Sequence, residues 1–298
     1  MSFTIDNIEV TGESIRNAII YFCNKTTDER GRTINRKPTF ITQVENQKLY
    51  YYFLLFGIRI SSCDTSLPDD IMGGIRFVPN RWTSGGSWEL EVANASLDPS
   101  PLYLQPPVNK VNGRCPLVNI PMPNGRNYSV QTTNCNDGIW SGVGTNPFTN
   151  KCCVLFDAQA RNEGGAAWIA PGQYLYYYYG DFKGEPAFAP AKGGVVTYRW
   201  APSRPGETFN PNKVVRETTN QSTLIHRTWF KDRLFNDSAG CQVIPASESL
   251  LKLAYWAKKH NSMGYPKNYQ YTLMNKEDFT TANAPKPTTF NWYSLFNF

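Results

Sequence analysis

Runs of apolar residues along the chain have the lengths and spacings of β-strands. Residues 49–60 are almost entirely apolar, which indicates a strand buried on both faces, as in the middle of a sandwich. In residues 88–93, Trp88, Leu90 and Val92 alternate with two glutamates, the pattern of a strand with one face in water. The same reasoning predicts further strands at residues 39–44, 128–131, 152–160, 174–179 and 195–200.

Long segments rich in Pro, Gly and Asn separate these strands. Residues 98–116, 134–150 and 180–194 are predicted to be surface loops, and Asn124 with Gly125 marks a tight turn. Short strands joined by long loops are typical of an antiparallel β-sandwich or jelly roll. We therefore predict a mainly β fold, with a β-sandwich domain over residues 1–200.

The pattern changes after a Pro-rich connection at residues 201–213. Residues 247–260 form the clearest helix, which Ser247 or Ser249 is expected to cap, and a second helix is predicted over 223–235. We therefore predict a smaller portion with mixed secondary structure at residues 213–283, followed by a C-terminal arm at residues 284–298. The expected helix 247–260 has an apolar stripe and a basic last turn, formed by Leu250, Leu251, Ala254, Ala257, Lys258, Lys259 and His260.

Composition narrows the class of protein. The 17 Tyr, 17 Phe and 8 Trp make 14% of the 298 residues aromatic, which favours strands and interfaces. The net charge is only +6, and the first 29 residues hold five acidic and two basic side chains. A basic N-terminal arm for nucleic acid is therefore not expected. A signal peptide is not expected either. A transmembrane segment is not expected because the longest apolar stretch, residues 49–58, spans about half of the ~20 residues that a membrane helix needs. The cellular location stays open.

The sequence predicts no metal or cofactor. Its seven cysteines are odd in number and form no C-x-x-C pair, so thiols in a reducing compartment are expected. Asp69 and Asp70 form a lone acidic pair after Pro68 and are expected to be solvated rather than to bind metal. The paired glycines lack the patterns of phosphate-binding loops.

No catalytic residue is predicted either. The chain has only two histidines, and no nucleophile motif surrounds any Ser or Cys. His226 is expected to be packed, and His260 to interact with the negative end of its helix. A hydrolase with a spatially assembled pair of carboxylates is the alternative, because such a pair leaves no spacing signal.

Two aromatic segments stand out as candidate subunit-contact or ligand-stacking surfaces. Consecutive residues of a strand point to opposite faces, so some of the four adjacent tyrosines, Tyr176, Tyr177, Tyr178 and Tyr179, must meet water or another chain. The C-terminal arm is too apolar to stay in water. Docking on its own subunit, on a neighbour, or on a membrane or partner are the alternatives. The large apolar residues of the arm are Phe290, Trp292, Tyr293, Leu295, Phe296 and Phe298.

These features favour a structural protein that assembles with itself into a particle or crystal, such as a viral capsid, spike or occlusion-type protein. The expected partner is a second copy of the chain, in a homo-oligomer or a lattice. The alternative function is a binding module whose exposed aromatic residues contact carbohydrate or a membrane surface, as in a lectin-like or membrane-active cytolytic protein.

Overall fold

The computed structural model describes residues 2–25, 53–60, 68–80, 85–97, 117–121, 127–131, 141–145, 153–157, 168–200, 214–228 and 240–285. For the four short strands between residues 117 and 157 only the backbone is described. The predicted strand at 39–44, the predicted loop at 98–116 and the aromatic residues of the C-terminal arm lie outside the described residues.

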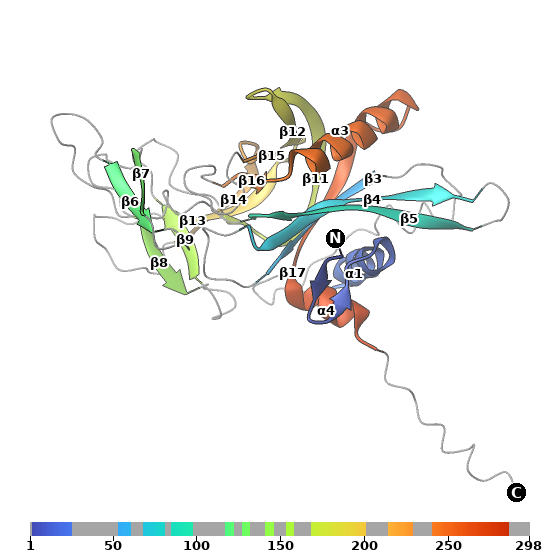
Figure 1. Ribbon diagram of the computed structural model, residues 1–298, viewed down its shortest axis with the longest axis horizontal. Coiled ribbons are helices and arrows are strands. Elements are labelled where there is room, and N and C mark those ends of the chain that lie inside the picture. Colours follow the sequence, from blue (N-terminus) through green and yellow to red (C-terminus); the bar gives the residue numbers. More distant parts are fainter. Residues whose placement is uncertain are drawn as a thin grey trace, which may run out of the picture.

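An eight-stranded mixed sheet forms the centre of the molecule, with the order β16-β15-β12-β11-β17-β3-β4-β5 (Figure 1). The sheet curls until its outer strands meet, where Ser96 and Val243 exchange two backbone hydrogen bonds of 2.9 and 3.0 Å. The predicted β-rich fold is thus confirmed. The strands are β3 (Phe53–Arg59), β4 (Asp70–Pro79), β5 (Gly86–Ala95), β11 (Gly172–Phe182), β12 (Glu185–Pro190), β15 (Ile225–Arg227), β16 (Gln242–Ile244) and β17 (Asn268–Asn275).

Two of the strand pairs in this sheet are parallel, β15 with β16 and β17 with β3, and the others are antiparallel. Smaller sheets accompany it. The hairpin of β1 (Thr4–Ile5) and β2 (Ile8–Glu9) lies near the N-terminus, and β10 (Trp168–Ile169), β13 (Val195–Trp200) and β14 (Val214–Asn220) form a three-stranded sheet. Two further hairpins pair β6 (Leu117–Pro121) with β7 (Asn127–Gln131), and β8 (Ser141–Thr145) with β9 (Cys153–Asp157).

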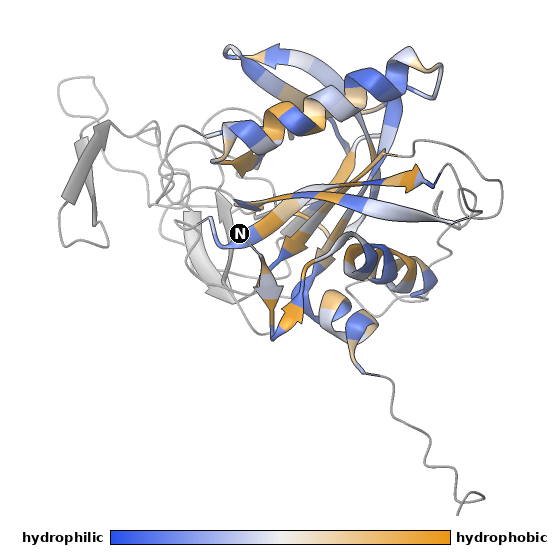
Figure 2. Ribbon diagram, turned by 45° about the vertical axis from the view of Figure 1, so that its right-hand side comes forward, coloured by the Kyte–Doolittle hydropathy of each residue, from blue (hydrophilic) through white to orange (hydrophobic). Residues whose placement is uncertain are grey.

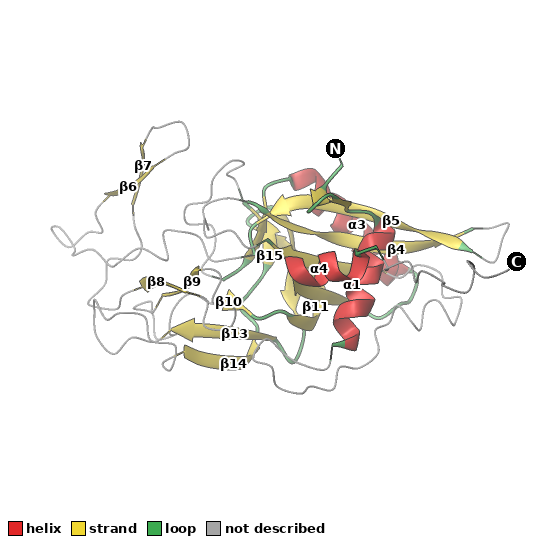
Figure 3. Cartoon of the chain, turned by 90° about the horizontal axis from the view of Figure 1, so that it is seen from below, coloured by secondary structure: helices red, strands yellow, loops and turns green. Residues whose placement is uncertain are grey.

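Helices cover both faces of the large sheet. Helix α3 (Ser247–Ser262) lies on one face, and α1 (Gly12–Asn24) and α4 (Lys276–Asn283) lie on the other, the side that Figure 3 brings to the front. Each layer encloses its own core. The α3-side core is rich in tyrosine and includes Tyr176, Tyr269 and Tyr271. The α1-side core is aliphatic and phenylalanine-rich. Figure 2 shows in orange where hydrophobic residues occur along the strands of the sheet and the helices.

Strand β3 is buried on both faces, as the sequence predicts. Phe53 and Leu55 point into the α3-side core, whereas Leu54, Phe56 and Ile58 point into the α1-side core. Helix α3 covers one face of the sheet, and helices α1 and α4 cover the other. The uninterrupted apolar run in β3 is therefore explained by two buried faces.

Strand β5 follows the predicted alternation. Trp88, Leu90 and Val92 pack against the α1-side core. Their neighbours face α3, where Glu89 forms an ion pair with Arg76 at 2.5 Å and Glu91 forms one with Lys252 at 2.6 Å. The polar face of the strand is therefore held by ion pairs at its margin.

The helix predicted over residues 223–235 is wrong for the part that the structure describes. Residues 225–227 form β15, which pairs with β12 and β16. Ile225 is fully buried in the α3-side core, so pairing and burial outweigh a weak helical pattern. Residues 229–239 lie outside the described residues.

The loop predicted at residues 180–194 contains strand β12. It forms a hairpin with β11 through a two-residue turn, in which Lys183 and Gly184 have φ of 55° and 83°. Pro186 and Pro190 obscure this strand in the sequence because proline lacks an N–H donor. The missing donors agree with the limited pairing between β12 and β15, which pair at a single position, Phe188 with Ile225.

The helix predicted over residues 247–260 is confirmed, and Leu250, Ala254 and Ala257 of its expected stripe are buried. Leu253 and Trp256 are buried as well, whereas Leu251 is exposed. The cap differs from the expected serines. Ala246 occupies the N-cap position, and no side chain caps the helix. Packing against the curled sheet therefore covers most of the predicted stripe and leaves Leu251 outside the buried face.

The sequence contains signals for α1 that we did not identify. Thr11 and Ser14 form a reciprocal capping box, with hydrogen bonds of 2.8 and 3.1 Å. Ile15, Ile19 and Phe22 then follow at helical spacing and are buried. Helix α4 was likewise missed.

The large sheet takes strands from both sides of residues 201–213. Strand β17 lies between β11 and β3, and pairs Tyr271 with Leu55 in register. The boundary expected near residue 200 therefore does not separate two sheets, because a late strand completes the centre of the sheet.

Candidate functional site

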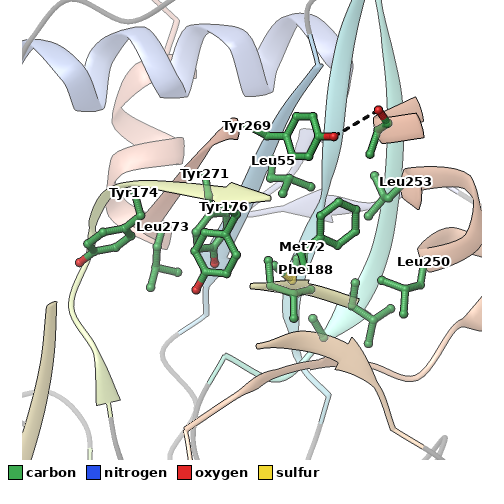
Figure 4. Packing of buried hydrophobic residues seen from close by; sticks show 14 of the residues in the cluster. Leu55, Met72, Tyr174, Tyr176, Phe188, Leu250, Leu253, Tyr269, Tyr271 and Leu273 are labelled. Atoms are coloured by element: carbon green, nitrogen blue, oxygen red, sulfur yellow. Dashed lines mark hydrogen bonds between the residues drawn. The ribbon is translucent and has the colours of Figure 1, made fainter. Parts of the chain in front are cut away.

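Strand β11 carries the four adjacent tyrosines and divides them between two environments. Tyr176 is fully buried, with its ring 5.1 Å from that of Tyr271 (Figure 4). Its hydroxyl donates to the Thr223 carbonyl at 3.3 Å. Burial raises the pKa of Tyr176 above its ordinary value. Tyr178 is half-buried against Phe188, with the Lys258 ammonium 5.1 Å from its ring centre. Tyr176 and Tyr178 therefore contribute to packing.

The outward residues of β11 form an exposed apolar surface. Leu175 is 41% exposed and Tyr179 is 52% exposed, and the Tyr177 ring lies 6.4 Å from the Tyr179 ring. We refer to Leu175, Tyr177 and Tyr179 as the outer strip. Of the tyrosines that the sequence nominates, Tyr177 and Tyr179 are the two that face outward.

A β-bulge shapes this end of the strip. Tyr178 pairs with Phe188, the next pair joins Gly180 to Ala187, and Tyr179 is therefore the extra residue. Gly180 has a φ of 106°, which a residue with a side chain rarely adopts. Because the bulge shifts the alternation by one residue, Phe182 also lies on the outer face, where its ring is 5.0 Å from His226. The bulge thus brings aromatic residues together at one end of β11.

The outer strip begins where the helical cover ends. The Gln173 side chain donates to Cys23 Sγ, in the last turn of α1, at 2.6 Å, and to Thr272 Oγ1 at 3.3 Å. Leu175 follows two residues later and is already exposed. The α1 layer therefore covers β3, β4, β5 and β17 but leaves the adjoining face of β11 accessible.

The outward face of α3 is the second exposed apolar surface. Leu251 and Tyr255, four residues apart on one helix face, are 53% and 57% exposed, and Met263 at the C-cap is 44% exposed. Within the described residues, every exposed large hydrophobic side chain belongs either to this face or to the outer strip. In this part of the chain, exposed large hydrophobic side chains thus occur in two places.

A partly open cavity of about 560 Å³ lies between β5 and the first turn of α3. Phe3, Val92 and Pro245 line its apolar side, and Arg227 and Ser247 contribute polar groups. Arg227 forms an ion pair with Glu185. The volume is within the range of small-molecule sites, roughly 300–1,000 Å³.

Both histidines are buried among aromatic side chains. His226 lies on β15, with Nδ1 2.7 Å from the Arg227 carbonyl. His260 ends α3, where Nε2 is 3.1 Å from the Pro266 carbonyl and the ring contacts Tyr265 and Tyr269. Each ring is positioned by packing and a backbone contact.

Asp70 does not behave as the solvated residue that the sequence suggests. It is 1% exposed, and its carboxylate accepts from the Ile60 N–H at 2.7 Å and the Leu97 N–H at 2.8 Å. Asp70 therefore ties together the ends of β3, β4 and β5. Within the described ranges, no three His, Cys, Asp or Glu side chains are grouped to hold a metal ion.

No family model, curated protein or solved structure matches the chain. Among the described helices, none combines the length and the hydrophobicity that crossing a membrane requires. The geometry of this chain is accordingly the basis for the functional proposal.

Proposed function

We propose that the protein is a non-enzymatic structural subunit that assembles with copies of itself through the outer strip. The supporting observation is that Leu175 and Tyr179 remain exposed on β11, with the partly buried Tyr177 between them. Burying a fully exposed side chain of this kind contributes roughly 1.5–3 kcal/mol, and here only the part that is still exposed contributes. Contact with a second copy removes this surface from water.

The surroundings of the outer strip suit contact between identical chains. Asn268 and Gln270 lie opposite Tyr177 and Leu175 on β17, and Ala189 lies opposite Tyr177 on β12. None of these residues is charged, so two copies facing each other here meet no like-charge repulsion. In a two-fold contact centred on Tyr177, Leu175 of each copy lies against Tyr179 of the other.

The strip alone is smaller than a stable interface, which buries on the order of 1,200–2,000 Å² in total. It therefore serves as the apolar centre of a wider contact. The C-terminal arm, with Phe290 and Phe298 near its ends, lies outside the described residues, and its docking on a neighbouring copy stays a prediction. Assembly into a particle or crystal extends this proposal.

A ligand-binding module is the second candidate function. The cavity beside the first turn of α3 favours it, because its volume fits a small molecule. Stacking of a sugar on the outer strip is less favoured, because the Tyr177 and Tyr179 rings are tilted by 54° and do not form a flat platform.

Light scattering coupled to size-exclusion chromatography tests the assembly proposal. The wild-type chain is expected to be oligomeric, and Tyr179→Lys is expected to give monomers, because the introduced ammonium would be buried without a partner against Leu175 of the other copy. Tyr255→Lys is the matched control, since Tyr255 is similarly exposed but lies on α3. A wild-type protein that is monomeric at all concentrations, or a Tyr179→Lys variant that still assembles, contradicts the proposal.

A further inference from the structure

We propose that the outward face of α3 docks onto an anionic lipid surface. This inference does not depend on self-assembly through the outer strip, because α3 and the outer strip lie on opposite faces of the large sheet. It rests on three observations: an apolar stripe, a concentration of positive charge, and a loop that holds a further lysine beside the helix.

The apolar stripe runs along the solvent side of the helix. Leu251, Tyr255 and Lys258 are spaced i, i+4 and i+7, which places them on one face of α3, and all three are exposed. The opposite face buries Leu250 and Trp256 in the α3-side core. Helix α3 therefore exposes apolar side chains on the side opposite its buried face, and packing within the subunit does not account for them.

Positive charge is concentrated on the same element. Helix α3 holds Lys252, Lys258 and Lys259 against one exposed acidic residue, Glu248 in its first turn, and Lys267 follows in the loop. Lys252 pairs with Glu91 and Lys276 pairs with Asp6. Lys258 and Lys267 are exposed, and among the described residues neither forms an ion pair with an acidic side chain; the Lys258 ammonium also lies 5.1 Å from the centre of the Tyr178 ring. The solvent side of α3 is thus cationic as well as apolar.

The loop after α3 extends this surface. His260 Nε2 lies 3.1 Å from the Pro266 carbonyl, and the His260 ring contacts Tyr265, so the loop is held against the last turn of the helix. Met263 at the C-cap and Lys267 in this loop are both exposed. We refer to Leu251, Tyr255, Lys258, Met263 and Lys267 as the α3 face.

The chemistry of the α3 face indicates which class of partner binds there. Tyrosine and lysine suit a membrane interface, where the ring lies at headgroup level and the ammonium reaches the phosphates, while aliphatic side chains enter the acyl region. A second copy of the chain is disfavoured, because a two-fold contact would bring like-charged lysines together. A nucleic acid would use the lysines but not Leu251 and Met263, which lack a flat ring for stacking on bases.

Sedimentation with vesicles tests the inference on the full chain. Binding is expected to phosphatidylcholine vesicles that contain phosphatidylserine and not to phosphatidylcholine alone. Lys258→Gln with Lys267→Gln should weaken binding by roughly thirtyfold, as expected for two lysines near an anionic surface. Leu251→Ser with Tyr255→Ser should weaken it further, because the apolar contribution is lost.

The matched control is Lys183→Gln with Lys192→Gln, which removes two exposed lysines outside α3 and should leave binding unchanged. Circular dichroism verifies that each variant is folded, and light scattering verifies that its oligomeric state is unchanged. No wild-type binding to anionic vesicles, or equal loss in the control, overturns the inference. Binding to a single-stranded RNA oligonucleotide in place of the vesicles also overturns it and assigns the face to nucleic acid.

Discussion

The outer strip and the α3 face both expose apolar side chains, yet they differ in charge. The strand partners of Leu175 and Tyr177 in the outer strip are the uncharged residues Asn268, Gln270 and Ala189, whereas the α3 face contains Lys258 and Lys267. An uncharged apolar surface can face its own copy without repulsion. A cationic apolar surface instead favours an anionic partner. Charge, more than exposed area, distinguishes the two proposed roles.

The largest expected effect is on the free energy of unfolding, and it distinguishes the buried side of α3 from the exposed side. Trp256→Ala should lower the free energy of unfolding by about 3–5 kcal/mol, because Trp256 is buried against Phe53 and Arg76. Tyr255→Ser, one residue away, should change it by no more than about 0.5 kcal/mol. Urea denaturation measures both. A large effect of Tyr255→Ser would show that the α3 face is covered within the subunit.

Salt should act in opposite directions on the two surfaces. Raising sodium chloride from ~0.05 to ~0.5 M is expected to reduce vesicle binding several-fold, because it screens the lysines of the α3 face. Self-assembly through the uncharged outer strip should be maintained or slightly strengthened over the same range. Light scattering and vesicle sedimentation across a salt series provide the two measurements. Assembly that weakens in parallel with vesicle binding would remove the distinction between the surfaces.

A smaller expected effect is a loss of stability at high pH, which arises in the tyrosine-rich core between the two surfaces. Burial raises the pKa of Tyr269 from 10.0 to about 12, while its hydroxyl donates to Asn261 Oδ1 at 2.7 Å. The unfolded chain loses this proton near pH 10, before the folded protein does. Stability is therefore fully present below pH 10 and is lost as the pH rises towards 12. Tyr269→Phe should reduce this slope in urea titrations, and an unchanged slope would contradict the assignment.

The local pattern of apolar and polar residues was sufficient to predict several secondary-structure elements. The apolar run of β3, the alternation of β5 and the helix at residues 247–260 each follow from side-chain periodicity, and the structure confirms them. Strand β12 was missed because Pro186 and Pro190 resemble loop residues. They are tolerated because β12 meets β15 at a single residue pair. Strand β15 was missed because its pairing with distant residues outweighs local propensity.

The sequence by itself determined that the chain is rich in strands, that β3 is buried on both faces and that consecutive tyrosines of β11 must divide between inside and outside. Tertiary structure decided which tyrosines face outward, because the bulge at Tyr179 and the extent of the α1 layer both depend on contacts between distant residues. It also decided that Leu251 is exposed and that Leu253 is buried. Periodicity defines the faces of an element, but only packing against the rest of the chain determines which face is covered.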